Sequence, residues 1–304
     1  MKAVFTIFTF ILFIFAKEPI EPIPKKVVYD RQKALLGKYL FLDTLLSKDE
    51  KVSCATCHDL ERGGADSKAV STGVEGKNGF INAPTVFNAY FNFKQFWNGR
   101  AKDLKEQANG PLHAPHEMGM TRGMVEKRLN SSPFYKKLFK KVYGTGTIRY
   151  EEVLDAIAEF EKALYTPNSK FDRFLRKETL LDPLEKRGYL LFKKLGCITC
   201  HNGINIGGNS FQKMGLVIPY DKPPSADRYE ITKERKDRYV YKVPSLRNVV
   251  LTAPYFHDGS VKTLEAAINK VSYHNLGFKL SKKEIEAIIA FLNTLTGERP
   301  DILK

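Results

Sequence analysis

The sequence of 304 residues contains only four cysteines, too few for a fold held together by disulfides. Tryptophan occurs once and methionine five times. Hydrophobic residues make up 43% of the chain and aromatic residues 12%, which excludes an intrinsically disordered protein. At about 100–200 residues per domain, the length allows two domains with hydrophobic cores.

Acidic residues are scarce compared with basic ones. The chain has 34 Asp and Glu against 49 Lys and Arg, a formal net charge of +15. A basic surface can attract nucleic acid, an anionic membrane or an acidic protein, and the charge alone does not choose among them. Because no nucleic-acid-binding motif accompanies the charge, we expect no nucleic acid partner and attribute the charge to docking of an acidic protein or to solubility.

Long hydrophobic runs are missing except at the N-terminus. Lys2 is followed by an uncharged run from Ala3 to Phe15 and then by Ala16. This pattern predicts a signal peptide over residues 1–16, since a membrane-spanning helix needs about 20 apolar residues. Ile14 is unfavourable for cleavage, which leaves an uncleaved anchor as the alternative. Either way we expect a periplasmic protein, soluble or loosely anchored.

The four cysteines all belong to two copies of the pattern C-x-x-C-H. They are Cys54, Cys57 and His58 in the first copy and Cys197, Cys200 and His201 in the second. Two thiols at this spacing can bond to the two vinyl groups of one heme, and the following histidine then ligates the iron. A zinc site would need the two pairs much closer together, and a redox dithiol needs no histidine after it. The sequence therefore predicts two covalently bound hemes c.

Apolar residues recur at helical spacing, and no run alternates as a strand does. We expect helices over 28–42, 133–143, 151–165, 183–195 and 282–295, with capping boxes at Asp182 and Ser281. Phe134, Leu138, Phe139 and Val142 should share one buried face. The fold class is predicted as all-α, with two tandem class I cytochrome c-like heme domains over residues 17–165 and 166–304. The long ordered loops 63–83 and 202–244 are expected to pack over the hemes.

Several further phrases occur in a fixed order around the two heme motifs. They are Leu36-Gly37-Lys38-Tyr39-Leu40-Phe41, Asn82-Ala83-Pro84-Thr85-Val86-Phe87-Asn88, Phe96-Trp97-Asn98-Gly99-Arg100-Ala101, Glu117-Met118-Gly119, Gly207-Gly208, Val243-Pro244-Ser245-Leu246-Arg247-Asn248 and Thr252-Ala253-Pro254-Tyr255-Phe256-His257-Asp258-Gly259. Together they resemble the bacterial diheme cytochrome c peroxidases over essentially all of the sequence after the signal.

This resemblance implies a division of labour between the two hemes. The N-terminal heme would reduce hydrogen peroxide, and the C-terminal heme would accept electrons from a small donor such as a cytochrome c or a cupredoxin. Glu117 falls on the family's distal acid–base residue, Gln107 on its distal-pocket glutamine, and Trp97 on the tryptophan between the hemes. A carboxylate can move a proton between the two peroxide oxygens, and a carboxamide can hold peroxide by hydrogen bonds. The resemblance also implies a homodimer.

A calcium ion between the domains is a further implication of the resemblance. Asn82 would supply a side-chain oxygen, and Thr252 and Pro254 would supply backbone carbonyls. Such oxygen ligands suit a hard cation. The alternative is that Asn82 only caps a turn.

Two positions depart from the family's pattern. Many members have a histidine sixteen residues after the first proximal histidine, where it ligates the N-terminal iron of the resting enzyme. This chain has Val74 there. Valine cannot ligate iron, so we expect this heme to be five-coordinate or water-bound without reductive activation.

The second departure is Val271, which stands where the family places the axial methionine of the C-terminal heme. Met214 and His274 are the main candidates to replace it, and Tyr273 is a third because the related tryptophylquinone-maturation enzyme uses a tyrosine. Each could instead be a packing residue.

Two histidines lie next to Glu117 in the sequence, His113 and His116. We expect both to be polar residues at the pocket rim rather than iron ligands.

Three functions therefore stay open at this point. The first is an enzyme, cytochrome-c peroxidase, which the retained Glu117 and Gln107 favour. The second is an electron-transfer diheme cytochrome without peroxidase activity, which Val271 favours. The third is a diheme oxidase that modifies a protein substrate, and ligation by Tyr273 would favour it.

Overall fold

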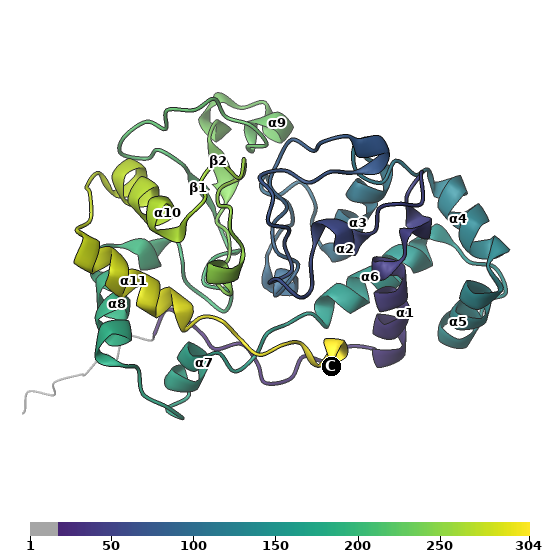
Figure 1. Cartoon of the computed structure of the whole chain (residues 1–304), viewed down its shortest axis with the longest axis horizontal. Helices are drawn as coiled ribbons and strands as arrows, with labels where there is room; N and C mark the ends of the chain where they lie inside the picture. Colours follow the sequence, from purple (N-terminus) through teal and green to yellow (C-terminus); the bar gives the residue numbers. More distant parts are fainter. Residues whose placement is uncertain (1–17) are drawn as a thin grey trace, which may run out of the picture.

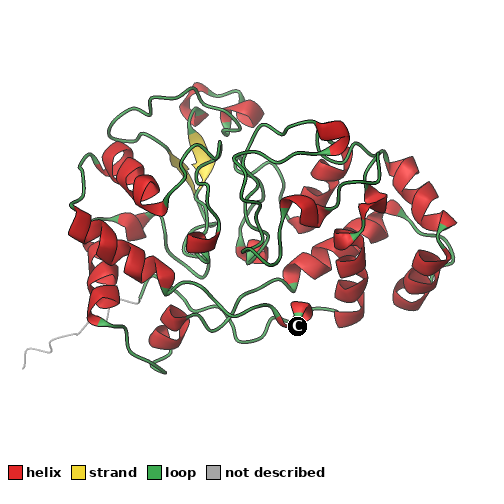
Figure 2. Cartoon of the chain, in the orientation of Figure 1, coloured by secondary structure: helices red, strands yellow, loops and turns green. Residues whose placement is uncertain are grey.

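The computed structural model describes residues 18–304 (Figure 1). Helices joined by long loops dominate it (Figure 2). The predicted signal peptide lies outside the described residues. Within residues 18–304, no helix is long and apolar enough to cross a membrane.

The first half is built around the crossing of two helices, α1 (Arg31–Leu42) and α6 (Tyr150–Lys162). Asp30 caps α1 by accepting hydrogen bonds from two backbone N–H groups of its first turn. Gly37 lies against the carbonyl oxygen of Ala156, where a side chain would collide with the backbone. The other helices of this half are α2 (Cys54–Cys57), α3 (Leu104–His113), α4 (Arg122–Ser131) and α5 (Pro133–Tyr143).

The second half has its own crossing pair, α8 (Pro183–Lys194) and α11 (Lys282–Asn293). It also contains α7 (Lys170–Leu175), α9 (Tyr229–Thr232) and α10 (Leu264–Val271). Two short strands, β1 (Phe211–Lys213) and β2 (Val240–Lys242), pair antiparallel with Phe211 opposite Lys242. The sequence analysis missed this pair because strands of three residues are too short to show an alternating pattern.

The two halves repeat the same local geometry. Gly188 lies against the carbonyl oxygen of Ala287 as Gly37 lies against that of Ala156. The rings of Phe41 and His58 have centroids 6.4 Å apart, and those of Phe192 and His201 are also 6.4 Å apart. Each half therefore places its C-x-x-C-H histidine beside a phenylalanine of its own helix crossing.

The two chain ends cross over between the halves. Ile20 packs in the hydrophobic core of the second half, and Ile302 packs in that of the first. Figure 1 shows the C-terminal segment running back to α1. At the centre of the second half, the fully buried Arg247 forms an ion pair of 2.9 Å with Asp172. This ion pair lies within the second half, whereas the packing of Ile20 and Ile302 ties the halves together beyond a single linker.

The predicted helices form with small shifts at their ends. The first begins at Arg31 rather than Val28 because Asp30 caps it, and the last ends at Asn293. The capping boxes at Asp182 and Ser281 are both present. The predicted face of α5 is wrong at one position: Phe134 is 51% exposed, and Tyr135 is buried instead.

Candidate heme and peroxide site

The Nδ1 atom of each C-x-x-C-H histidine forms a hydrogen bond with a backbone carbonyl oxygen. His58 Nδ1 lies 3.3 Å from the carbonyl oxygen of Gly64, and His201 Nδ1 lies 3.3 Å from that of Ile206. Burial lowers the pKa of both imidazoles, that of His201 to about 4. A neutral imidazole that donates from Nδ1 keeps a lone pair on Nε2, which is the form that ligates a metal.

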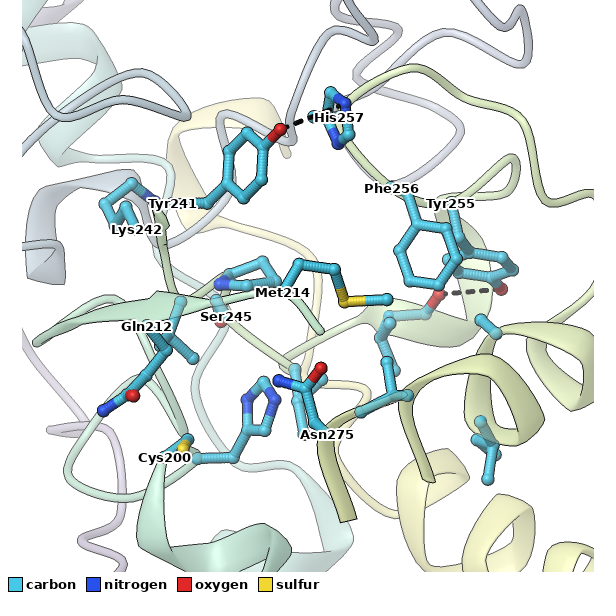
Figure 3. A pocket seen from close by; sticks show the side chains of 18 of the residues that line it. Cys200, Gln212, Met214, Tyr241, Lys242, Ser245, Tyr255, Phe256, His257 and Asn275 are labelled. Carbon is cyan, nitrogen blue, oxygen red and sulfur yellow. Dashed lines mark hydrogen bonds between the residues drawn. The ribbon is translucent and has the colours of Figure 1, made fainter. Parts of the chain in front are cut away.

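The second heme motif opens into a cavity of about 320 Å³ (Figure 3). Cys197, Cys200 and His201 line one part of it, and most of the remaining wall is apolar. This volume is in the range of cofactor pockets. None of the four cysteines forms a disulfide, so both thiols of the pair are available for covalent attachment. The residues present therefore fit a heme c.

The candidates for the sixth iron ligand differ in position. Met214 lines the cavity, and Figure 3 shows its thioether reaching into the space. Val271 also lines the cavity but has no ligating atom. His274 does not line it: its Nδ1 lies 3.1 Å from the carbonyl oxygens of Ile218 and Pro219. Of the three candidates, the methionine alone has access to the cavity.

Tyr273, the third candidate, is also absent from the cavity wall. Its ring is 38% exposed and lies near the ammonium group of Lys279.

Glu117 lies in a tight turn that follows α3. Its N–H donates to the carbonyl oxygen of Ala114 at 3.0 Å, and Gly119 completes the turn with φ of +64°. Burial raises the pKa of the Glu117 carboxyl, and the neighbouring His116 and Arg100 side chains oppose this increase. Burial raises the pKa of Cys54 and Cys57, and the Glu117 carboxylate lies close enough to the first heme motif to add to both increases.

The other polar residues around Glu117 have distinct environments. Gln107 lies on α3, and its side chain has no hydrogen-bond partner within residues 18–304. His116 Nε2 lies 3.6 Å from Glu117 Oε1. His113 points elsewhere: its ring nitrogens lie 2.8 Å from the carbonyl oxygen of Met120 and 3.1 Å from the Tyr150 hydroxyl. Both ring nitrogens of His113 therefore have partners within the protein, although the residue is exposed.

One residue near Glu117 was missed by sequence reasoning. Arg100 lies 3.4 Å from the ring centroid of Phe96 and acts on the Glu117 carboxyl. Arg100 belongs to the Phe96–Ala101 phrase, but nothing in that phrase points to a partner in a distant turn.

Trp97 lies where the two halves meet. Its indole N–H donates to the carbonyl oxygen of Asn82 at 3.0 Å, and its ring centroid is 6.4 Å from that of His257. His257 in turn stacks on Tyr241, with centroids 4.5 Å apart. Trp97 also lines the cavity of the second heme motif. An aromatic contact therefore joins the halves at this point.

The three residues implied for calcium are all found along the cavity wall. Asn82, Thr252 and Pro254 all line it. The Asn82 amide nitrogen lies 3.0 Å from the carbonyl oxygen of Lys68, which leaves its Oδ1 free of any protein donor in the described chain. The described residues contain no cluster of His, Cys, Asp or Glu that could hold a metal ion. A cation here would depend on amide and carbonyl oxygens, which suit calcium.

Comparison with known families gives two matches. The model described as di-haem cytochrome c peroxidase matches residues 31–180, and the model described as cytochrome c matches residues 185–296. The cytochrome c551 peroxidase of Nitrosomonas europaea is 48% identical, over 94% of this chain and 86% of its own length. The chain belongs to the di-haem cytochrome c peroxidase family. The predicted family is thereby confirmed, with two heme c groups as cofactors.

This chain is also similar to a second curated peroxidase and to a solved structure. The cytochrome c peroxidase Ccp of Escherichia coli is 46% identical over 92% of this chain, which spans 61% of the length of that relative. A solved MauG-like protein associated with microbial copper homeostasis has a TM-score of 0.81 and 28% identity, over 94% of this chain and 95% of that one. Sequence similarity and structural similarity therefore both show the mostly helical fold of the family.

Proposed function

We propose that this chain is a cytochrome-c peroxidase that reduces hydrogen peroxide to two molecules of water, using two electrons and two protons. The observation that carries the proposal is the position of Glu117, a carboxylate of raised pKa on the side of the first heme motif. When bound, the hemes supply an open iron site for peroxide and hold the electrons. A pure electron carrier would have no use for an acid–base group there.

Glu117 is the group that moves the proton. Its carboxylate takes the proton from the near peroxide oxygen and returns it to the leaving oxygen, a role for which a raised pKa is suited. Arg100 and His116 limit the increase in the pKa of this carboxyl. Gln107, whose carboxamide has no partner among residues 18–304, holds the substrate by hydrogen bonds and does not titrate.

Two proposals concern the iron ligands. His58 would hold the N-terminal heme, and Val74 would supply no second ligand, so this site would need no prior reduction to admit peroxide. His201 and Met214 would hold the C-terminal heme, since Met214 lines the cavity and His274 does not. A methionine ligand raises the heme reduction potential, which suits a site that receives electrons.

The two halves would cooperate across their interface. We assign Trp97 to electron transfer between the hemes, supported by its contact with His257. A calcium ion held by Asn82, Thr252 and Pro254 would stabilise the same interface. The repeated helix crossings support two tandem class I cytochrome c-like domains, divided near residues 165 and 166.

The partners and location follow the family resemblance. A small periplasmic cytochrome c or cupredoxin would donate the electrons, and the net charge of +15 favours an acidic donor. Export by the N-terminal signal and assembly into a homodimer are part of the same proposal.

Turnover tests the proposal against its alternatives. Reduced cytochrome c is mixed with the holoprotein and peroxide, and oxidation of the donor is followed. A carrier would be oxidised or reduced once without peroxide turnover, and peroxide-driven modification of an added protein without donor oxidation would indicate the protein-modifying oxidase.

A further inference from the structure

The buried side chain of Lys242 has no role in the proposed mechanism. Lys242 is the last residue of β2, and it is only 7% exposed. Its ammonium group has no ion-pair or hydrogen-bond partner within residues 18–304. Burial lowers the pKa of this amine to about 8, and no neighbouring carboxylate raises it again. A buried cation is strongly unfavourable without a counter-charge.

The surroundings of Lys242 indicate where a counter-charge could come from. Lys242 lines the cavity that contains Cys197, Cys200 and His201, and Figure 3 shows it next to Tyr241. No Asp or Glu is among the described residues that line this cavity. A heme brings two propionate carboxylates, on the porphyrin edge opposite the vinyl groups that react with cysteine. The cavity must therefore accommodate two anions, and the protein offers a buried cation.

The repeat between the halves points to the same position. The N–H of Asn82 donates to the carbonyl oxygen of His257 at 2.7 Å, and the N–H of Lys242 donates to that of Trp97, also at 2.7 Å. Trp97 and His257 precede matching turns, which contain Gly99 and Gly259 with φ of +70° and +60°. Asn82 and Lys242 thus occupy equivalent positions in the two halves. Asn82 is proposed to bind a calcium ion, and Lys242 has a positively charged side chain of its own.

We propose that the ammonium group of Lys242 pairs with a propionate of the heme attached at Cys197 and Cys200, and raises the reduction potential of that heme. The inference rests on the proposed heme site but not on peroxide chemistry. A fixed positive charge stabilises the ferrous state, which has one positive charge fewer than the ferric state. Lys242 would thereby help the C-terminal heme to accept electrons.

Spectroelectrochemical titration of holoprotein with the substitution Lys242→Gln tests the pairing. We expect the ferrous-to-ferric ratio of the C-terminal heme at a fixed potential to fall about tenfold, equal to about 59 mV for one electron. Lys242→Arg keeps the charge and should stay close to the wild type. Lys213→Gln is the matched control, because Lys213 lines the same cavity on β1 but is exposed to solvent, which screens its charge.

Three results would overturn the proposal: an unchanged potential in Lys242→Gln, an equal shift in Lys213→Gln, or a shift confined to the N-terminal heme. Should Lys242→Gln fail to accumulate with heme, a crystal structure of the wild-type holoprotein decides. Nζ within about 3.2 Å of a propionate oxygen supports the pairing, and Nζ directed elsewhere contradicts it. Failure of wild-type peroxide turnover would overturn the proposed function instead and leave the titration result standing.

Discussion

The backbone N–H of Val74 donates a hydrogen bond of 2.9 Å to the carbonyl oxygen of Glu117. Val74 is 1% exposed, so it packs firmly beside the proposed catalytic turn. Gly73 approaches the same turn so closely that a side chain would collide with the carbonyl oxygen of Glu117. Lys48 Nζ also lies 2.8 Å from Glu75 of this loop. Many other family members have an iron-ligating histidine at this position. In this chain the position is a buried valine, and its loop is held against the turn that contains Glu117.

This arrangement predicts the resting state of the N-terminal heme. In the all-ferric wild type, electron paramagnetic resonance should show that heme as high-spin, because the loop that contains Val74 has no histidine to ligate the iron. The substitution Val74→His should create a low-spin fraction and slow the reaction of the all-ferric protein with peroxide. A low-spin bis-histidine signal from this heme in the wild type would contradict the prediction.

The cavity position of Met214 predicts the ligation of the other heme. Met214→Leu should remove the near-infrared charge-transfer band of methionine-ligated ferric heme and lower the potential of the C-terminal heme by more than about 59 mV. His274→Gln is the control and should leave both unchanged. If His274→Gln removes the ligand signature and Met214→Leu does not, the assignment to Met214 is wrong.

The contact between Trp97 and His257 predicts an effect on electron transfer. Trp97→Phe removes the indole and its hydrogen bond to Asn82, so inter-heme electron transfer should slow by about tenfold, an increase in barrier of about 1.4 kcal/mol. Stopped-flow absorbance after mixing with peroxide measures this rate. Tyr90→Phe, at a partly exposed aromatic residue, is the control. An unchanged rate in Trp97→Phe would exclude the role.

The raised pKa of Glu117 predicts how activity depends on pH. The base form of a carboxyl exists above its pKa, so peroxide reduction should fall as pH falls through a value above 4.5, the ordinary value for glutamate. Glu117→Gln should abolish this acidic limb and reduce kcat/KM by about 10²–10⁴-fold. Glu286→Gln, at an exposed site on α11, should keep the wild-type profile. Persistence of the limb in Glu117→Gln would assign it to another group.

The sequence predicted the chemistry of this protein better than its three-dimensional detail. The two C-x-x-C-H motifs and the ordered phrases led to the family and to two hemes c, because covalent heme attachment requires fixed residue types at fixed spacing. The main helices and their caps at Asp30, Asp182 and Ser281 depend on local hydrogen bonds, and the last two could be predicted.

Other features depend on contacts that are remote in the sequence. The pair β1 and β2, the exposure of Phe134, the crossing of the chain ends and the charge of Arg100 beside Glu117 are of this kind. The burial of Lys242 is another, because its neighbours in the sequence do not show that its ammonium group has no partner among residues 18–304. The sequence had left three candidates for the sixth ligand of the C-terminal heme, and of these Met214 lines the cavity while His274 and Tyr273 do not.

Peroxide turnover is the most direct test of the central claim. All-ferric wild-type holoprotein is mixed with reduced cytochrome c in excess, peroxide is added in known amount, and donor oxidation is followed by absorbance. The account predicts two donor molecules oxidised for each peroxide, and nearly complete loss of this reaction in Glu117→Ala with both hemes retained. Failure of the wild type to oxidise any reduced donor, or full turnover in Glu117→Ala, would contradict it.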